Sequence, residues 1–131
     1  MRLHFRNLER PKKAAKRIAK ALAGALSLAK VQNGLAVALG YRDWHEFETA
    51  HSANAPAPLD QELPADLFRD RIAELALKLA VALGVTDSEA QYVLLVSRLT
   101  GDRQVSLDDH IDFCIKAMQA RAEELGLKGS L

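Results

Sequence analysis

The residues best suited to catalysis or metal binding lie in the segment LDDHIDFC, residues 107–114. His110 and Cys114 are one helical turn apart, but two ligands do not complete a tetrahedral zinc site. Asp108 and Asp109 fall in the first turn of a predicted helix, where the helix dipole favours negative charge. We therefore expect no metal and no cofactor. A small hydrolase or lyase that uses His110 and its neighbouring carboxylates is the weakest of the functions considered.

The sequence lacks the other common signals of an enzyme. The phosphate-binding pattern G-x-x-x-x-G-K-[ST] is absent. Cys114, the only cysteine, falls on the apolar stripe of its predicted helix, where surroundings do not activate a thiol. A single cysteine excludes an internal disulfide, as is usual in a reducing compartment. No signal peptide and no long apolar segment is evident. We expect a non-enzymatic cytoplasmic protein without membrane contact.

The net charge of +1 conceals a division along the sequence. Residues 1–50 contain ten Lys or Arg and four Asp or Glu, a net charge of +6, whereas residues 51–131 carry −5. The first 30 residues contain nine basic residues and a single acidic one. This asymmetry indicates a polyanion or an acidic protein surface as a partner.

A basic helix face is the strongest functional signal in the sequence. Pro11 fits the first turn of a helix over 11–23, and Gly24 follows as its stop. Five basic side chains of this helix fall within an arc of about 140°, opposite an apolar stripe. They are Lys12, Lys13, Lys16, Arg17 and Lys20, preceded by Arg2, Arg6 and Arg10. Clustered cations of this kind are what phosphate neutralisation requires, although a solvated helix face is the alternative.

Two more helices are predicted after the basic one. Ser27 is a plausible N-cap for a helix over 28–40. Asp43 followed three residues later by Glu46 resembles a capping box, which would open a short helix over 44–51. Residues 10–51 are therefore predicted to form three short helices with tight connections.

This plan also allows a helix-turn-helix arrangement. In such an arrangement Lys30, Gln32 and Asn33 could reach a nucleic-acid groove. Asn33 followed by Gly34 favours a turn, which weakens the helix prediction at this point.

The segment LGYRDWHEF, residues 39–47, holds much of the aromatic content of the chain. Tyr41, Trp44 and Phe47 are spaced to close a small core. Arg42 and His45 would then point away from that core, and they are the members of the segment that we expect to contact a partner.

Residues 52–63 contain two prolines and small polar residues, and they predict a linker or loop. A long apolar helix is predicted over 64–83, which other parts of the chain or a second copy must cover, so a homodimer is one expectation. Capping boxes predict helices over 87–101 and 107–125. The run YVLLV, residues 92–96, would also suit a strand, but the preceding cap favours a helix.

Residues 8–48 resemble a short helical module of uncharacterised bacterial and plasmid-borne proteins that are often labelled glyoxalase-related. Its pattern is an AKRL helix, a segment beginning LS and an ending similar to LGY-x-DWHEL. The matching residues are Ala15 to Ile18, Leu26, Ser27, Ala36, Leu39 to Tyr41 and Asp43 to Phe47. The resemblance implies a bacterial helical accessory module and no glyoxalase activity, because that enzyme fold places metal ligands on β-strands.

The predicted fold is all-α, with about six helices. It consists of a basic three-helix module over 1–51, a linker or loop over 52–63, and an acidic helical hairpin or three-helix unit over 64–131. The leading hypothesis is a small regulator or antitoxin-like protein that binds nucleic acid through the basic helix. A protein–protein adaptor or inhibitor is the alternative. The expected contact residues are Arg10, Lys12, Lys13, Lys16, Arg17, Lys20, Lys30, Arg42 and His45.

Overall fold

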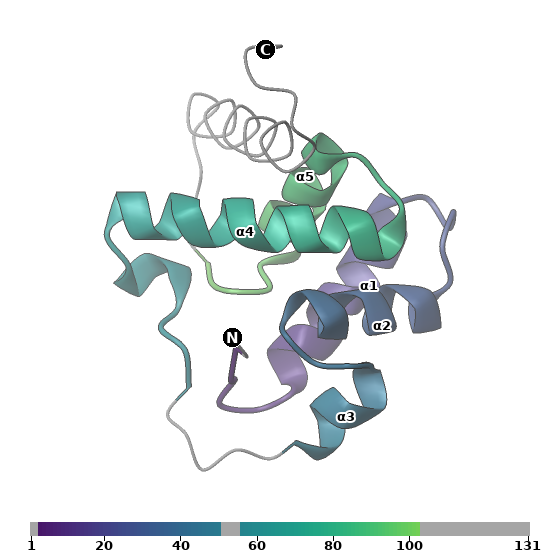
Figure 1. Cartoon of the computed structure of the whole chain (residues 1–131), viewed down its shortest axis with the longest axis horizontal. Helices are drawn as coiled ribbons and strands as arrows, with labels where there is room; N and C mark the ends of the chain where they lie inside the picture. The colour runs from purple at the N-terminus through teal and green to yellow at the C-terminus, as the bar shows by residue number, and fades with distance from the viewer. Residues whose placement is uncertain (1–2, 51–55, 103–131) are drawn as a thin grey trace.

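The computed structural model describes residues 3–50 and 56–102, and within them the chain is all-helical, as predicted. The elements are α1 (Glu9–Ala21), α2 (Leu28–Ala38), α3 (Trp44–Thr49), the 3₁₀ helix η1 (Asp60–Glu62), α4 (Ala65–Leu83) and α5 (Asp87–Ser97) (Figure 1). Residues 92–96 belong to α5 and do not form a strand. The predicted helix over 107–125, with His110 and Cys114, lies outside the described residues.

Side-chain caps begin three of the helices at the predicted positions. The Ser27 hydroxyl accepts the Lys30 backbone N–H at 3.2 Å, and the Asp43 carboxylate accepts that of Glu46 at 2.8 Å. Thr86 and Glu89 form a complete capping box at the start of α5. These bonds satisfy backbone donors that a helix leaves unpaired at its first turn, so they fix where each helix starts.

The first helix ends earlier than the sequence predicts. We expected it to reach residue 23, but α1 stops at Ala21. Ala23 and Gly24 both adopt positive φ angles, 54° and 75°, and two consecutive residues of this kind cannot continue a right-handed helix. The chain therefore turns toward α2 one half-turn before the predicted end.

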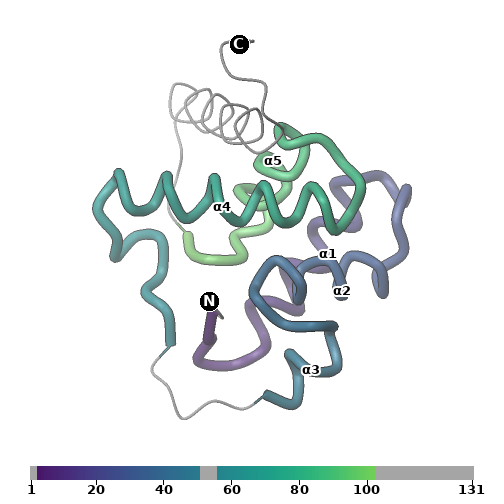
Figure 2. The backbone as a smooth tube through the Cα atoms, in the orientation of Figure 1, coloured from purple at the N-terminus to yellow at the C-terminus, as the bar shows by residue number. Residues whose placement is uncertain are grey.

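One hydrophobic core joins helices from both sides of the predicted boundary at 52–63. In the described residues, α4 packs against α2 and α5, while α1 packs against α2 and α5 (Figures 1 and 2). The fully buried side chains at the centre come from all four helices and include Ile18, Leu35, Leu79 and Val93. The position of α1 is thus set by contacts with α2, the next helix along the chain, and with α5, which is distant in the sequence.

Gly34 allows α2 to lie close to α4. A Cβ atom at this position would overlap the side chain of Leu83 at the end of α4. The Asn33–Gly34 pair lies inside α2 and does not form the turn that its sequence favours. The absence of a side chain at Gly34 permits the close packing against α4.

The aromatic residues of segment 39–47 close the core, as the sequence suggests. Tyr41 and Trp44 each lie about 5 Å from Phe47 between ring centroids, at 5.0 and 5.1 Å, and all three side chains are buried. The Tyr41 hydroxyl donates to the Leu3 carbonyl at 3.0 Å. This bond ties the N-terminal segment to the aromatic cluster just before α1 begins.

Among the described helices, no single one has both the length and the apolar composition of a membrane span; α4 and α5 reach them only as a pair, bent by 113°.

Candidate nucleic-acid interface

The basic residues of α1 lie on its exposed side. Lys12, Lys13, Lys16, Arg17 and Lys20 are all solvent-exposed. The opposite side of α1 is buried through Ala14, Ala15 and Ile18, each with 0% exposure. The small alanine side chains bring the helix close to its neighbours, so the backbone that carries the basic face is held firmly by the core.

The five basic residues form two rows along the helix. Lys12, Lys16 and Lys20 follow one another at intervals of four residues, and Lys13 and Arg17 form a second row beside them. At a rise of about 1.5 Å per residue, the first row is about 12 Å long. We call it the lysine row. It presents separate ammonium groups along one line, which suits contact with successive phosphates.

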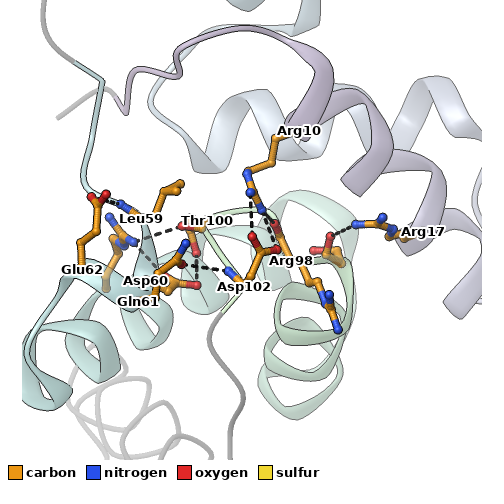
Figure 3. A network of polar contacts seen from close by, with 11 residues as sticks. Arg10, Arg17, Leu59, Asp60, Gln61, Glu62, Arg98, Thr100 and Asp102 are labelled. Carbon is orange, nitrogen blue, oxygen red and sulfur yellow. Dashed lines mark hydrogen bonds and ion pairs between the residues drawn. The ribbon is translucent and has the colours of Figure 1, made fainter.

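Two arginines of α1 also bind the end of α5 and the residues after it. The Arg17 guanidinium donates to the Ser97 carbonyl at 3.0 Å. Arg10 donates to the Arg98 carbonyl at 2.9 Å and pairs with the Asp102 carboxylate through two hydrogen bonds (Figure 3). Both predicted contact residues thus have a structural role that the sequence did not reveal.

A hollow of about 340 Å³ lies between α1 and the end of α5. Its lining residues are Asn7, Glu9, Arg10, Lys13, Arg17, Arg98 and Asp102. We call this the α1–α5 hollow. It brings together four basic and two acidic side chains, an excess of two positive charges.

The pKa of Asp102, one of the acidic side chains of the hollow, is lowered by the neighbouring arginines. The hydrogen bonds from Arg10 hold the pKa of Asp102 below its ordinary value, and the charges of Arg98 and Arg17 act in the same direction. Asp102 is therefore ionised at neutral pH and neutralises Arg10, which leaves Lys13, Arg17 and Arg98 as the cations available to a ligand.

A buried polar cluster holds the segment that carries Asp102, one of the residues lining the hollow. Asp60 is 5% exposed and accepts hydrogen bonds from Arg71 at 2.6 Å and from the Thr100 hydroxyl at 2.9 Å (Figure 3). The Gln61 side chain accepts the backbone N–H of Asp102 at 3.0 Å. Through these bonds η1 and α4 hold residues 100–102, and hence Asp102, in place beneath α1.

The remaining predicted contact residues lie outside the α1–α5 hollow. Lys30 is exposed in the first turn of α2. Arg42 and His45 are exposed at α3, where the Arg42 guanidinium lies 3.9 Å from the Glu46 carboxylate. The structure therefore brings Arg10, Lys13 and Arg17 together in one hollow. Lys30, Arg42 and His45 lie elsewhere, at α2 and α3.

Asn33, which the helix-turn-helix arrangement would place in a groove, makes a hydrogen bond within the fold. Its side-chain oxygen accepts the backbone N–H of Trp44 at 3.0 Å, so it stabilises the start of α3. Gln32 is only partly exposed, and α3 has six residues. Of the three residues predicted to reach a groove, Lys30 alone is exposed and makes no side-chain hydrogen bond of this kind within the described residues.

Sequence reasoning missed Arg98 and Asp102 because neither belongs to a motif. Arg98 ends α5 with a φ of 57°, and Asp102 lies in the loop that follows. Their link to α1 depends on packing across about ninety residues, for which no local pattern exists. The signals that pointed to this surface were the basic face of the helix predicted over 11–23 and the excess of positive charge in the first 30 residues.

No group of three His, Cys, Asp or Glu side chains within residues 3–50 and 56–102 could hold a metal ion. The proposed histidine and cysteine pair at 110 and 114 lies outside that part.

No protein-family model, no curated protein and no solved structure matches the chain.

Proposed function

We propose that this protein is a non-enzymatic nucleic-acid-binding protein that contacts phosphate groups through the basic face of α1. One observation carries the proposal: five basic side chains are exposed together on a helix whose other face is fixed in the core. A surface of this kind binds the phosphate backbone and not a particular base sequence.

The charge of the lysine row is available to a ligand. Lys12, Lys16 and Lys20 form no ion pair with any described side chain, in contrast to Arg10. An anion that reaches the row therefore does not have to displace a carboxylate of residues 3–50 or 56–102. This favours phosphate binding over a purely structural role for these three lysines.

The proposed biological role is that of a small regulator or antitoxin-like protein of a bacterial mobile element. The support for this finer role is the resemblance of residues 8–48 to plasmid-borne helical modules, together with the compact helical plan.

The test is fluorescence anisotropy of a labelled DNA duplex and a matching RNA, titrated at several salt concentrations. Neutralisation of four or five phosphates predicts a slope of about −4 in a plot of log affinity against log salt concentration. The triple variant Lys12→Glu, Lys16→Glu, Lys20→Glu should abolish binding. Undiminished binding by this variant would contradict the proposal.

A matched control separates a local contact from a general charge effect. Lys16→Glu and Lys78→Glu change the net charge equally, but Lys78 lies on α4, where it pairs with Glu74 at 3.1 Å. We expect Lys16→Glu to weaken binding much more than Lys78→Glu does. Equal losses would mean that net charge alone drives the association.

An adaptor or inhibitor that binds another protein is the second candidate function. Tyr92 and Val96 are 53% and 41% exposed, one turn apart on α5, and exposed aromatic residues are enriched at protein interfaces. Affinity purification with and without nuclease distinguishes the two functions. A stoichiometric protein retained after nuclease treatment, with no nucleic acid in the untreated sample, would favour the adaptor.

A further inference from the structure

We infer that the α1–α5 hollow is a binding site for a phosphate monoester, such as the terminal 5′-phosphate of a nucleic acid. This inference rests on the proposed function for the identity of its ligand. It assigns the hollow a task separate from that of the lysine row, which contacts phosphates along the backbone.

The charges in the hollow favour a dianion. Arg10, Lys13, Arg17 and Arg98 contribute four positive charges, against two negative charges from Glu9 and Asp102. A phosphate monoester carries a charge of about −1.5 to −2 at neutral pH, whereas a phosphodiester carries −1. The excess of two positive charges is therefore balanced by a monoester and only half balanced by a backbone phosphate.

Two of the four cations, Arg17 and Arg10, are held in place before a ligand arrives. Arg17 uses a hydrogen bond to the Ser97 carbonyl to fix its guanidinium, which retains further N–H donors for an anion. Arg10 is fixed by the Arg98 carbonyl and by Asp102. Because these side chains are already ordered, binding a phosphate there costs less conformational entropy than binding to free surface arginines.

Arg98 adds a charge that the end of α5 places at the hollow. The residue has a left-handed backbone conformation and an exposed side chain, and its side chain extends away from Arg10 in Figure 3. Its charge nevertheless acts on Asp102, on the hollow's wall. Because arginine is long and carries several N–H donors, the exposed Arg98 side chain can close over a bound phosphate.

The experiment compares two duplexes of identical sequence, both labelled at a 3′ end, one with a 5′-phosphate and one with a 5′-hydroxyl. Anisotropy titration of the wild-type protein should show at least about threefold tighter binding of the phosphorylated duplex. In Lys13→Gln and Arg98→Gln this preference should disappear. Lys16→Gln, which changes the lysine row outside the hollow, should weaken both duplexes and keep the preference.

The outcomes separate the two proposals. Equal binding of both duplexes by the wild type overturns the monoester site and leaves the nucleic-acid function standing. If neither duplex binds, the nucleic-acid function fails. An NMR titration with phenyl phosphate then tests whether the hollow binds a phosphate monoester. Amide shifts confined to residues of the hollow, and lost in Arg98→Gln, would support it; dimethyl phosphate, a diester, should produce smaller shifts. The absence of shifts with phenyl phosphate would overturn it.

Discussion

The guanidinium of Arg10 and the carboxylate of Asp102 are joined by two hydrogen bonds, at 3.2 and 3.0 Å, across 92 positions of sequence. The pair connects α1 to the loop after α5, and it lies in the wall of the α1–α5 hollow. Asp102 therefore stabilises the fold and at the same time opposes the binding of an anion.

Asp102→Asn should change stability and nucleic-acid affinity in opposite directions. The pair is partly exposed, so its loss should lower the free energy of unfolding by only about 0.5–1 kcal/mol. Removing a negative charge from the hollow should tighten the binding of a 5′-phosphorylated duplex about two- to fivefold at low salt. Urea unfolding and anisotropy titration measure the two effects. Weaker binding by Asp102→Asn would contradict the role assigned to the hollow.

The contribution of Asp102 to stability should depend on pH. Because its pKa is lower in the folded protein, the ion pair stabilises the fold at any pH above the ordinary pKa of aspartate, about 3.9. This stabilisation is lost as the pH falls through the lower pKa of the folded state. The difference in unfolding free energy between wild type and Asp102→Asn should thus be constant above about pH 5 and shrink in strong acid. A difference that grows with acidity would contradict the pairing.

Gly34→Ala should destabilise the protein, against the usual effect of alanine in a helix. Alanine favours a helix over glycine by about 1 kcal/mol. Here its Cβ would overlap the Leu83 side chain, and such overpacking costs about 1–3 kcal/mol. Thermal unfolding should show a lower midpoint. Leu83→Val removes part of the obstructing side chain. Gly34→Ala should therefore lower the unfolding midpoint less in the Leu83→Val background than in the wild type.

Asp60→Ala should be the most damaging single change among the polar residues that the structure describes. It leaves the Arg71 guanidinium, whose side chain is only 13% exposed, without its carboxylate, and breaking such a pair costs up to about 3–5 kcal/mol. The exposed pair of Lys78 and Glu74 gives the control, because Glu74→Ala should cost under about 0.5 kcal/mol. Chemical denaturation measures both. A loss at Asp60 as small as that at Glu74 would show that the buried cluster does not hold residues 100–102.

Features encoded by adjacent residues were predictable from the sequence. The caps at Ser27, Asp43 and Thr86 depend on bonds that span three residues, so their positions can be identified directly. The burial of Trp44 and Phe47 follows in the same way from their spacing on one helix face.

Features that depend on distant residues were not predictable. Asp60 lies in a segment that the sequence presents as a linker, and its burial results from Arg71 on α4 and Thr100 after α5. The pairing of Arg10 with Asp102 is also invisible in either local stretch. A charge pattern locates a basic surface, but it does not distinguish cations with internal partners from cations without them.

The buried side of α1 has a thermodynamic consequence for any ligand of its exposed side. Since Ala14, Ala15 and Ile18 are already fully packed, the backbone beneath the lysine row does not need to fold when an anion arrives. Association should therefore bury little new apolar surface and produce only a small change in heat capacity. Calorimetry over a range of temperatures would then record a nearly constant enthalpy, the behaviour of a surface prepared in advance and not of a segment that folds on its target.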